Sequence, residues 1–168
     1  PELDELKADT LDQDFLDIIS IKQSLIPFSL SLESLKNFIN DYLKKHILNY
    51  LQKCSKLPSD LSSLLARIHE KADYEITFND LAILHHHFPK KFKKIITTST
   101  MQENHTGKLC IYDAKKTPNC SVAQACIASS AIPGVFKSVW INAQKHLDGG
   151  CIEPLPSEYF ENNENTLE

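Results

Sequence analysis

All four glycines of this 168-residue chain lie beyond residue 106, at positions 107, 134, 149 and 150. Glycine is the residue that tight turns and left-handed backbone most often require, so its absence from residues 1–106 suits helices joined by short turns. We therefore expect a helical first half and a change of backbone character further along. The last two glycines stand side by side directly after Asp148, and a chain with so few glycines needs a reason for that pair.

Apolar residues recur with helical spacing along the first half. In residues 33–53, ESLKNFINDYLKKHILNYLQK, they fall at i, i+3, i+4 and i+7, which predicts an amphipathic helix. Either Ser59 or Asp60 can cap a second helix, which carries the apolar residues of 61–68. A further helix, which ends before Pro27, is expected from the spacing of Leu11, Phe15, Ile18 and Ile19.

We interpret residues 1–75 as a mainly helical segment, or insertion, whose role the sequence leaves open. Such helices can pack plainly against a sheet, form a lid over a site in the second half, or bind an activating partner. A separate possibility is that residues 10–75 are a protein-binding module in their own right.

From Thr77 onward, helix and strand patterns alternate. Thr77, followed three residues later by Asp80, is a capping-box variant that predicts a short helix ending near His87. Runs of β-branched and aromatic residues predict strands, and a stretch of small residues predicts a helix packed closely on a sheet. The strands are expected over 95–100, 109–112, 135–141 and 146–147, and the helix over 121–130. This order predicts an α/β fold for residues 76–168.

Composition excludes several classes of protein. Lys and Arg number 18 and Asp and Glu 22, so the formal charge is −4, whereas a nucleic-acid-binding protein needs a basic face. No apolar run reaches the roughly 20 residues of a membrane span. The five cysteines are odd in number and none forms a C-x-x-C pair, which argues against a disulfide framework or structural zinc and favours a reducing, cytoplasmic compartment.

Asp148 follows the strand-like pair His146-Leu147 and precedes Gly149-Gly150. A carboxylate at a strand end, beside residues without side chains, is easily reached by a substrate or a catalytic partner. We expect the glycines to permit a sharp turn with positive φ and to leave the carboxylate unshielded. The alternative is an ordinary tight turn, in which the aspartate accepts backbone N–H bonds.

Two motifs around this turn resemble the patatin-like phospholipases. Residues 128–136, ASSAIPGVF, match the form A-S-x-A-x-P-x-x-F, which in that family comes shortly before a catalytic D-G-G such as residues 148–150. Upstream, residues 77–81 are similar to the family's T-F-x-x-L, and residues 95–100 with Thr106-Gly107 are similar to its strand and T-G segment. The resemblance covers residues 76–157.

The resemblance implies a three-layer α/β/α fold and the hydrolysis of lipid acyl esters by a Ser–Asp dyad without a cofactor. Asp148 would be the dyad aspartate, which orients the serine hydroxyl and accepts its proton, and Gly149 and Gly150 would keep the site open. A free carboxylate is a weak base for an alcohol, so such a dyad needs a partly desolvated site with donors ready for the oxyanion.

The sequence departs from the family because it contains no G-x-S-x-G elbow and no glycine-rich oxyanion loop. We therefore interpret residues 76–168 as the C-terminal half of a patatin-like catalytic domain, which needs an N-terminal half that carries the serine. A smaller departure from the family is Glu153, because many relatives have Asn at this position. The alternative is a catalytically inactive patatin-like scaffold that binds a membrane or a protein.

The helical insertion also resembles bacterial patatin-like toxins that act inside host cells, where a host protein activates them. A phospholipid or another lipid ester would be the substrate, and peripheral association with a membrane is expected. The basic run Lys90, Lys91, Phe92, Lys93 and Lys94 is the candidate contact with anionic lipid. Its alternative is a solvated face that precedes a buried strand.

Other polar residues of the chain could in principle belong to a site. The side chains of His85–His87 point about 100° apart on a helix, so they cannot converge on one ion, and no metal site is predicted. His146 lies two residues before Asp148 and is either a third catalytic member or a structural residue. Ser129 and Ser130 lack a glycine elbow and are expected to be small packing residues.

Overall fold

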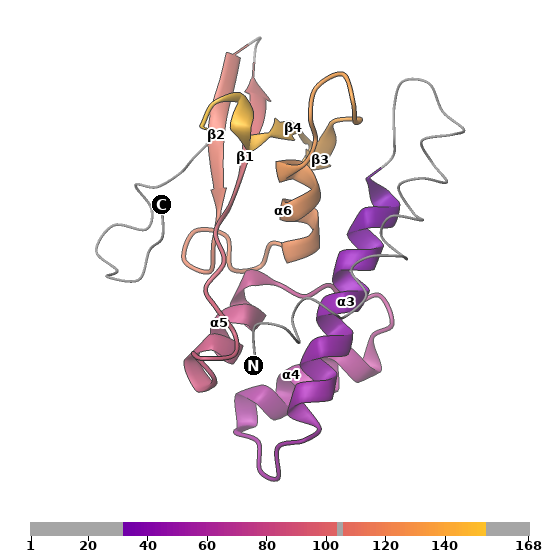
Figure 1. The fold of residues 1–168 in the computed structure, drawn as a ribbon, viewed down its shortest axis with the longest axis vertical. Helices are drawn as coiled ribbons and strands as arrows, with labels where there is room; N and C mark the ends of the chain where they lie inside the picture. Colours follow the sequence, from indigo (N-terminus) through magenta and orange to yellow (C-terminus); the bar gives the residue numbers. More distant parts are fainter. Residues whose placement is uncertain (1–31, 104–105, 154–168) are drawn as a thin grey trace, which may run out of the picture.

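The computed structural model describes residues 32–103 and 106–153, and Figure 1 shows their arrangement. The helices are α3 (Glu33–Leu51), α4 (Ser59–Glu70), α5 (Phe78–His87) and α6 (Val122–Ser129), with the 3-10 helix η1 (Gly149–Cys151). The strands are β1 (Thr97–Glu103), β2 (Thr106–Tyr112), β3 (Val139–Ile141) and β4 (Gln144–Asp148). The helix expected before Pro27 lies outside the described residues.

The strands form one sheet in the order β2-β1-β4-β3, and every neighbouring pair is antiparallel. The β3–β4 hairpin turns through Asn142 and Ala143, whose φ angles are 50° and 62°. Two successive positive φ values belong to a type I′ turn, whose twist matches that of the strands it joins. This tight turn fixes the direction of β4, which ends at Asp148.

All four strand predictions need correction at their ends. The strands expected over 109–112 and 146–147 are longer, as β2 and β4. The strand expected over 95–100 is β1, which begins two residues later and continues to Glu103. The strand expected over 135–141 is confined to β3, because the N–H groups of Val135 and Phe136 both donate to the carbonyl of Ile132 and form a turn. Residues 130–138 are therefore mostly a loop between α6 and the sheet.

Helix α6 packs on one face of the sheet, and α3 packs on the other side of α6 (Figure 1). A buried apolar cluster joins these elements: Leu32, Ile127, Ala128, Ala131 and Val139. On the opposite face of the sheet, Ile152 lies near Thr100 and Gly107. The molecule is an α/β fold, as the sequence predicts, and the three-layer α/β/α arrangement stays a prediction.

A second core joins the helical half to the sheet half. Side chains of α3, α4 and α5 pack with β2 and α6 in one cluster of buried residues: Ile47, Leu51, Leu61, Leu64, Ile68, Ile76, Phe78, Leu81, Leu84, Tyr112, Val122 and Ala125. Removing α6 and β2 would expose this apolar surface to water. The shared core argues against a helical module that folds by itself.

The capping box expected at the start of α5 is confirmed. Thr77 Oγ1 accepts the backbone N–H of Asp80 at 3.2 Å, and Asp80 Oδ2 accepts the N–H of Thr77 at 2.9 Å. Asp80 is buried, and its carboxylate also accepts hydrogen bonds from Arg67 Nη2 at 2.9 Å and Tyr74 Oη at 2.8 Å. This fully paired carboxylate fastens α4, the following connector and α5 together.

The cap expected for α4 is wrong. The helix begins at Ser59, Pro58 stands at its N-cap, and no side chain caps it. Proline is favoured at helix starts because its missing N–H has no partner there in any case. Asp60 instead accepts the N–H of Leu61 at 2.9 Å and contacts His87 Nε2 at 2.8 Å, which links α4 to the end of α5.

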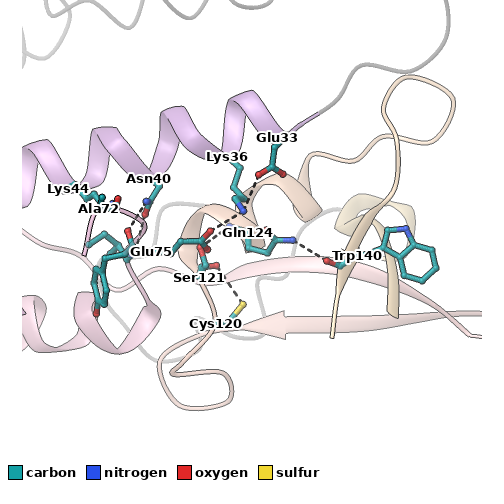
Figure 2. Close-up of polar contacts among 12 residues, drawn as sticks. Glu33, Lys36, Asn40, Lys44, Ala72, Glu75, Cys120, Ser121, Gln124 and Trp140 are labelled. Carbon is teal, nitrogen blue, oxygen red and sulfur yellow. Dashed lines mark hydrogen bonds and ion pairs between the residues drawn. The ribbon is translucent and has the colours of Figure 1, made fainter. Parts of the chain in front are cut away.

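Polar contacts fasten the connector between α4 and α5 to α3, as Figure 2 shows. Asn40 donates to the carbonyl of Tyr74 at 3.0 Å and accepts the N–H of Ile76 at 2.9 Å. Lys36 Nζ lies 2.9 Å from the carboxylate of Glu75. The carbonyl of Ile76 then accepts the N–H of Val122, so the same connector positions the first turn of α6.

Candidate active site

Asp148 is the last residue of β4 and pairs with Ser99 of β1 in the sheet. Its N–H donates to the carbonyl of Ala131 at 3.0 Å, so the end of β4 is tied to the exit of α6. Its Oδ1 accepts the N–H of Gly150 at 2.7 Å and caps η1. This is the hydrogen-bonded aspartate turn that was the alternative interpretation, and it holds the carboxylate in one orientation.

The half-buried Asp148 lines a pocket of about 440 Å³. Three segments form its wall: the start of β1, the end of α6 and the residues that follow β4. The lining residues are Ile96, Thr97, Thr98, Cys126, Ser129, Ser130, Asp148, Gly150 and Glu153. No residue of α3, α4 or α5 is among them, so these helices do not form a wall of this pocket.

The two glycines after Asp148 are needed because the chain packs closely there, and not because the backbone is left-handed. Neither has a positive φ, so the expectation of positive φ at this turn is wrong; among the described glycines only Gly134 has one. A β-carbon on Gly149 would lie 2.7 Å from the backbone oxygen of Thr98. A β-carbon on Gly150 would lie 2.9 Å from Asp148 Oδ1. Bare backbone therefore lets the turn approach β1 and leaves room for the carboxylate.

His146 has the structural role that the sequence left as one of two possibilities. It is buried, and its Nδ1 lies 2.9 Å from Ser99 Oγ and 3.1 Å from Tyr112 Oη. Burial lowers the pKa of His146, and the backbone of Ile141 opposes this by accepting a hydrogen bond. Burial also raises the pKa of Tyr112 to about 12. The neutral imidazole thus joins three strands beneath α6, and it does not line the pocket.

Ser129 and Ser130 were expected only to pack, yet both line the pocket beside Asp148. Ser130 Oγ donates to the carbonyl of Cys126 at 3.0 Å, one turn back in α6. Thr97 and Thr98 of β1 also line it. The signal in the sequence was only that Ser129 and Ser130 stand at the end of a predicted helix and that Thr97 and Thr98 lie within a predicted strand.

The histidines form the last turn of α5, and the basic run of residues 90–94 is the lysine-rich loop that follows this helix. The four lysines are exposed, whereas Phe92 is half-buried and packs edge-on against Tyr50, with 5.3 Å between ring centroids. His85 Nδ1 lies 2.7 Å from the carbonyl oxygen of Phe92, while His87 contacts Asp60 on α4. His85 and His87 thus have separate partners, and within the described ranges no group of three or more His, Cys, Asp or Glu could hold a metal.

Chemically, the pocket offers the carboxylate of Asp148, which a hydrogen bond holds in one orientation, and Glu153 also lines it. The hydrogen bond from Gly150 engages Oδ1, and Oδ2 makes none to any residue within 32–103 or 106–153. Such an oxygen can accept a proton from a hydroxyl that enters the pocket.

The part of the chain that the structure describes contains no helix long and apolar enough to cross a membrane.

Comparison with known protein families identifies one family. The family described as patatin-like phospholipase matches residues 4–160, which takes in the helical first half as well as the sheet. No curated protein and no solved structure matches the chain. The chain belongs to the patatin-like phospholipase family, whose general function is lipid hydrolysis.

Proposed function

From its membership of the patatin-like phospholipase family, we propose that this chain supplies the acidic residue of a Ser–Asp dyad in a phospholipase A-like lipid acyl hydrolase. Asp148 is that residue. The observation that carries the proposal is the position of its carboxylate, which lines a pocket with Oδ1 held by Gly150. The proposal assigns Gly149 and Gly150 to the turn that keeps this position.

The serine comes from an N-terminal half of the domain, on a separate chain or on a longer form of this one, because no G-x-S-x-G occurs in the 168 residues. Its Oγ attacks the carbonyl carbon of the lipid ester while its proton passes to Asp148 Oδ2. The bond to the leaving alcohol breaks, the alcohol takes up the proton, and the acyl group stays on the serine. A water molecule then attacks the acyl carbon and gives a proton to the same carboxylate. The bond to the serine Oγ breaks, that oxygen takes the proton back, and the fatty acid leaves. No cofactor takes part.

A membrane surface is part of the proposal, since the substrate is a lipid. The four exposed lysines that follow α5 are one candidate for attraction to anionic lipid. They precede Ile96 and Thr97, which line the Asp148 pocket. Action inside a host cell with an activating host protein is a further part of the proposal, and it rests on resemblance to bacterial toxins alone.

A catalytically inactive scaffold is the second candidate, and a full gene product without G-x-S-x-G would favour it. Such a protein would keep the fold and bind a membrane or a protein without hydrolysis. The two candidates differ in whether a polypeptide that carries the serine completes the pocket.

Fatty-acid release from mixed phospholipid vesicles tests the proposal. The chain is co-expressed with a family polypeptide that carries G-x-S-x-G, and release is measured with and without eukaryotic cell lysate. We expect Asp148→Asn to reduce release at least roughly a thousandfold, because an amide keeps the turn but cannot take the proton. Asp113→Asn is the matched control, since Asp113 Oδ1 also accepts an N–H two residues on, from Lys115 at 2.7 Å. No release from a folded complex under any condition would favour the scaffold.

A further inference from the structure

The loop between α6 and β3 carries an exposed apolar tip, defined as residues 132–135, Ile-Pro-Gly-Val. Ile132 is 47% exposed and Val135 is 49% exposed. The residues on either side point inward: Ala131 is fully buried, and Phe136 packs against the cluster shared by α6 and α3. The tip therefore projects from a packed base, with two branched aliphatic side chains in water.

The backbone holds the tip in a defined shape. The N–H groups of Val135 and Phe136 donate to the carbonyl of Ile132 at 3.1 and 3.0 Å. Gly134 has a φ of +81°, and a β-carbon there would meet nothing within 4 Å. A pre-shaped apolar tip surrounded by open space loses little conformational entropy when another surface covers it.

The tip lies beside the Asp148 pocket. Ser129 and Ser130, which line the pocket, directly precede its base, and the carbonyl of Ala131 accepts the N–H of Asp148. Figure 1 shows this loop, in orange, at the opposite end of α6 from α5 and the lysines that follow it. The tip is thus a separate surface from the lysine-rich loop.

Charge around the tip suits a phospholipid surface. Lys137 is exposed just beyond it, and none of residues 130–138 is acidic. An ammonium group at the level of lipid headgroups attracts anionic lipid, while neighbouring aliphatic side chains enter the acyl boundary. A specific protein partner would need far more contact area than two side chains provide.

We propose that the tip of residues 132–135 inserts into the surface of a phospholipid membrane and holds the mouth of the Asp148 pocket against the lipid. This inference rests on the proposed function, because it assumes that the pocket acts on lipid. The tip then contacts the membrane next to the site, and the ammonium group of Lys137 attracts anionic lipid headgroups.

Vesicle binding of the whole chain tests the inference. Co-sedimentation with vesicles of phosphatidylcholine and phosphatidylserine is compared for the native chain and a variant with Ile132→Gln and Val135→Gln. We expect roughly tenfold weaker binding, because two half-exposed aliphatic side chains no longer leave water. The control is Tyr42→Gln, which changes an apolar residue that is 44% exposed on α3. Circular dichroism checks that every variant is folded.

A fluorescent reporter follows insertion directly. The chain has one tryptophan, Trp140, so Val135→Trp in a Trp140→Phe background places a single indole at the tip. We expect its emission to shift to shorter wavelength with vesicles and to be quenched by brominated lipid. An unshifted emission, vesicle binding unchanged by the two Gln substitutions, or a native chain that does not bind vesicles would each overturn the inference.

The two proposals can fail separately, because vesicle binding needs no hydrolysis. Binding and an emission shift without fatty-acid release in the reconstituted complex would support the tip and count against the dyad. If release does occur, the tip variant should lose activity on vesicles but keep it on a soluble short-chain ester. Equal losses on both substrates would place the tip in the site itself and overturn its membrane role.

Discussion

Gly149 lies so close to Thr98 that a β-carbon on the glycine would stand 2.7 Å from the threonine carbonyl oxygen. The turn after β4 therefore presses directly on the backbone of β1. This contact, together with the hydrogen bond from Asp148 N–H to Ala131, fixes where the Asp148 carboxylate leaves the sheet. The position of the carboxylate depends on the absence of a side chain at one particular residue.

Substitution of the two glycines should have different consequences. Gly149→Ala should lower the free energy of unfolding by about 2 kcal/mol, because the clash is with backbone that cannot move without disturbing the sheet. Chemical denaturation measures this loss. Gly150→Ala is the matched variant, since its β-carbon would meet the Asp148 Oδ1 atom, which a side-chain rotation can displace. It should retain most of the stability but reduce fatty-acid release in the reconstituted complex. Equal stability losses for both variants would contradict this account.

His146 should make the stability of the protein depend on pH. Burial lowers its pKa in the folded state, so between about pH 6.5 and that lower pKa the unfolded chain binds more protons than the folded one. The part of the folding stability that depends on a neutral His146 is fully present above about pH 6.5. It is lost as pH falls, by at most about 1.4 kcal/mol per pH unit.

Urea unfolding at a series of pH values measures this dependence. The native chain should lose stability on acidification more steeply than the variant His146→Gln, which has no imidazole to protonate. His86→Gln, at an exposed position in the same protein, should follow the native curve. A His146→Gln curve parallel to the native one would show that this residue does not carry the effect.

Local patterns in the sequence predicted elements well where the determining residues are near one another. Thr77 and Asp80 are three residues apart, and their reciprocal hydrogen bonds need nothing from the rest of the chain. The amphipathic spacing of 33–53 similarly predicted α3, which ends two residues earlier. The order of the strands and α6 along the chain was also predicted, because each strand contains residues that favour strands.

Features that depend on distant residues could not be read from the sequence. His146 and Ser99 are 47 positions apart, and only the pairing of β4 with β1 brings them together. Ser129 reaches the Asp148 pocket because α6 packs on that same face. The loop before β3 was mistaken for a strand, since Val135 and Phe136 suit strands but bond back to Ile132. Residue composition indicates which secondary structure a segment favours, but tertiary packing determines which structure it adopts.

In the lysine-rich loop of residues 90–94, Phe92 should stabilise the fold, whereas the four lysines should form a charged surface. Phe92→Ala should lower the free energy of unfolding by about 2 kcal/mol, because the ring packs against Tyr50 and Phe88. Replacement of the four lysines around it by glutamine should leave stability nearly unchanged. If this loop contacts anionic lipid, the four-lysine variant should bind vesicles more weakly at low salt, and the difference should shrink at high salt. Phe92→Ala with undiminished stability would show that the ring is not an anchor.

The turn between β3 and β4 stores backbone strain at Ala143, whose φ is 62°. A residue with a β-carbon pays about 1 kcal/mol in this region, and glycine does not. We therefore expect Ala143→Gly to raise the free energy of unfolding by about 1 kcal/mol, measured by chemical denaturation. The same substitution at Ala66, exposed within α4, should lower it by a similar amount, because glycine in a helix interior adds only disorder to the unfolded chain. Opposite signs at the two positions would confirm the left-handed turn, whereas a loss at both would mean that Ala143 does not adopt it in solution.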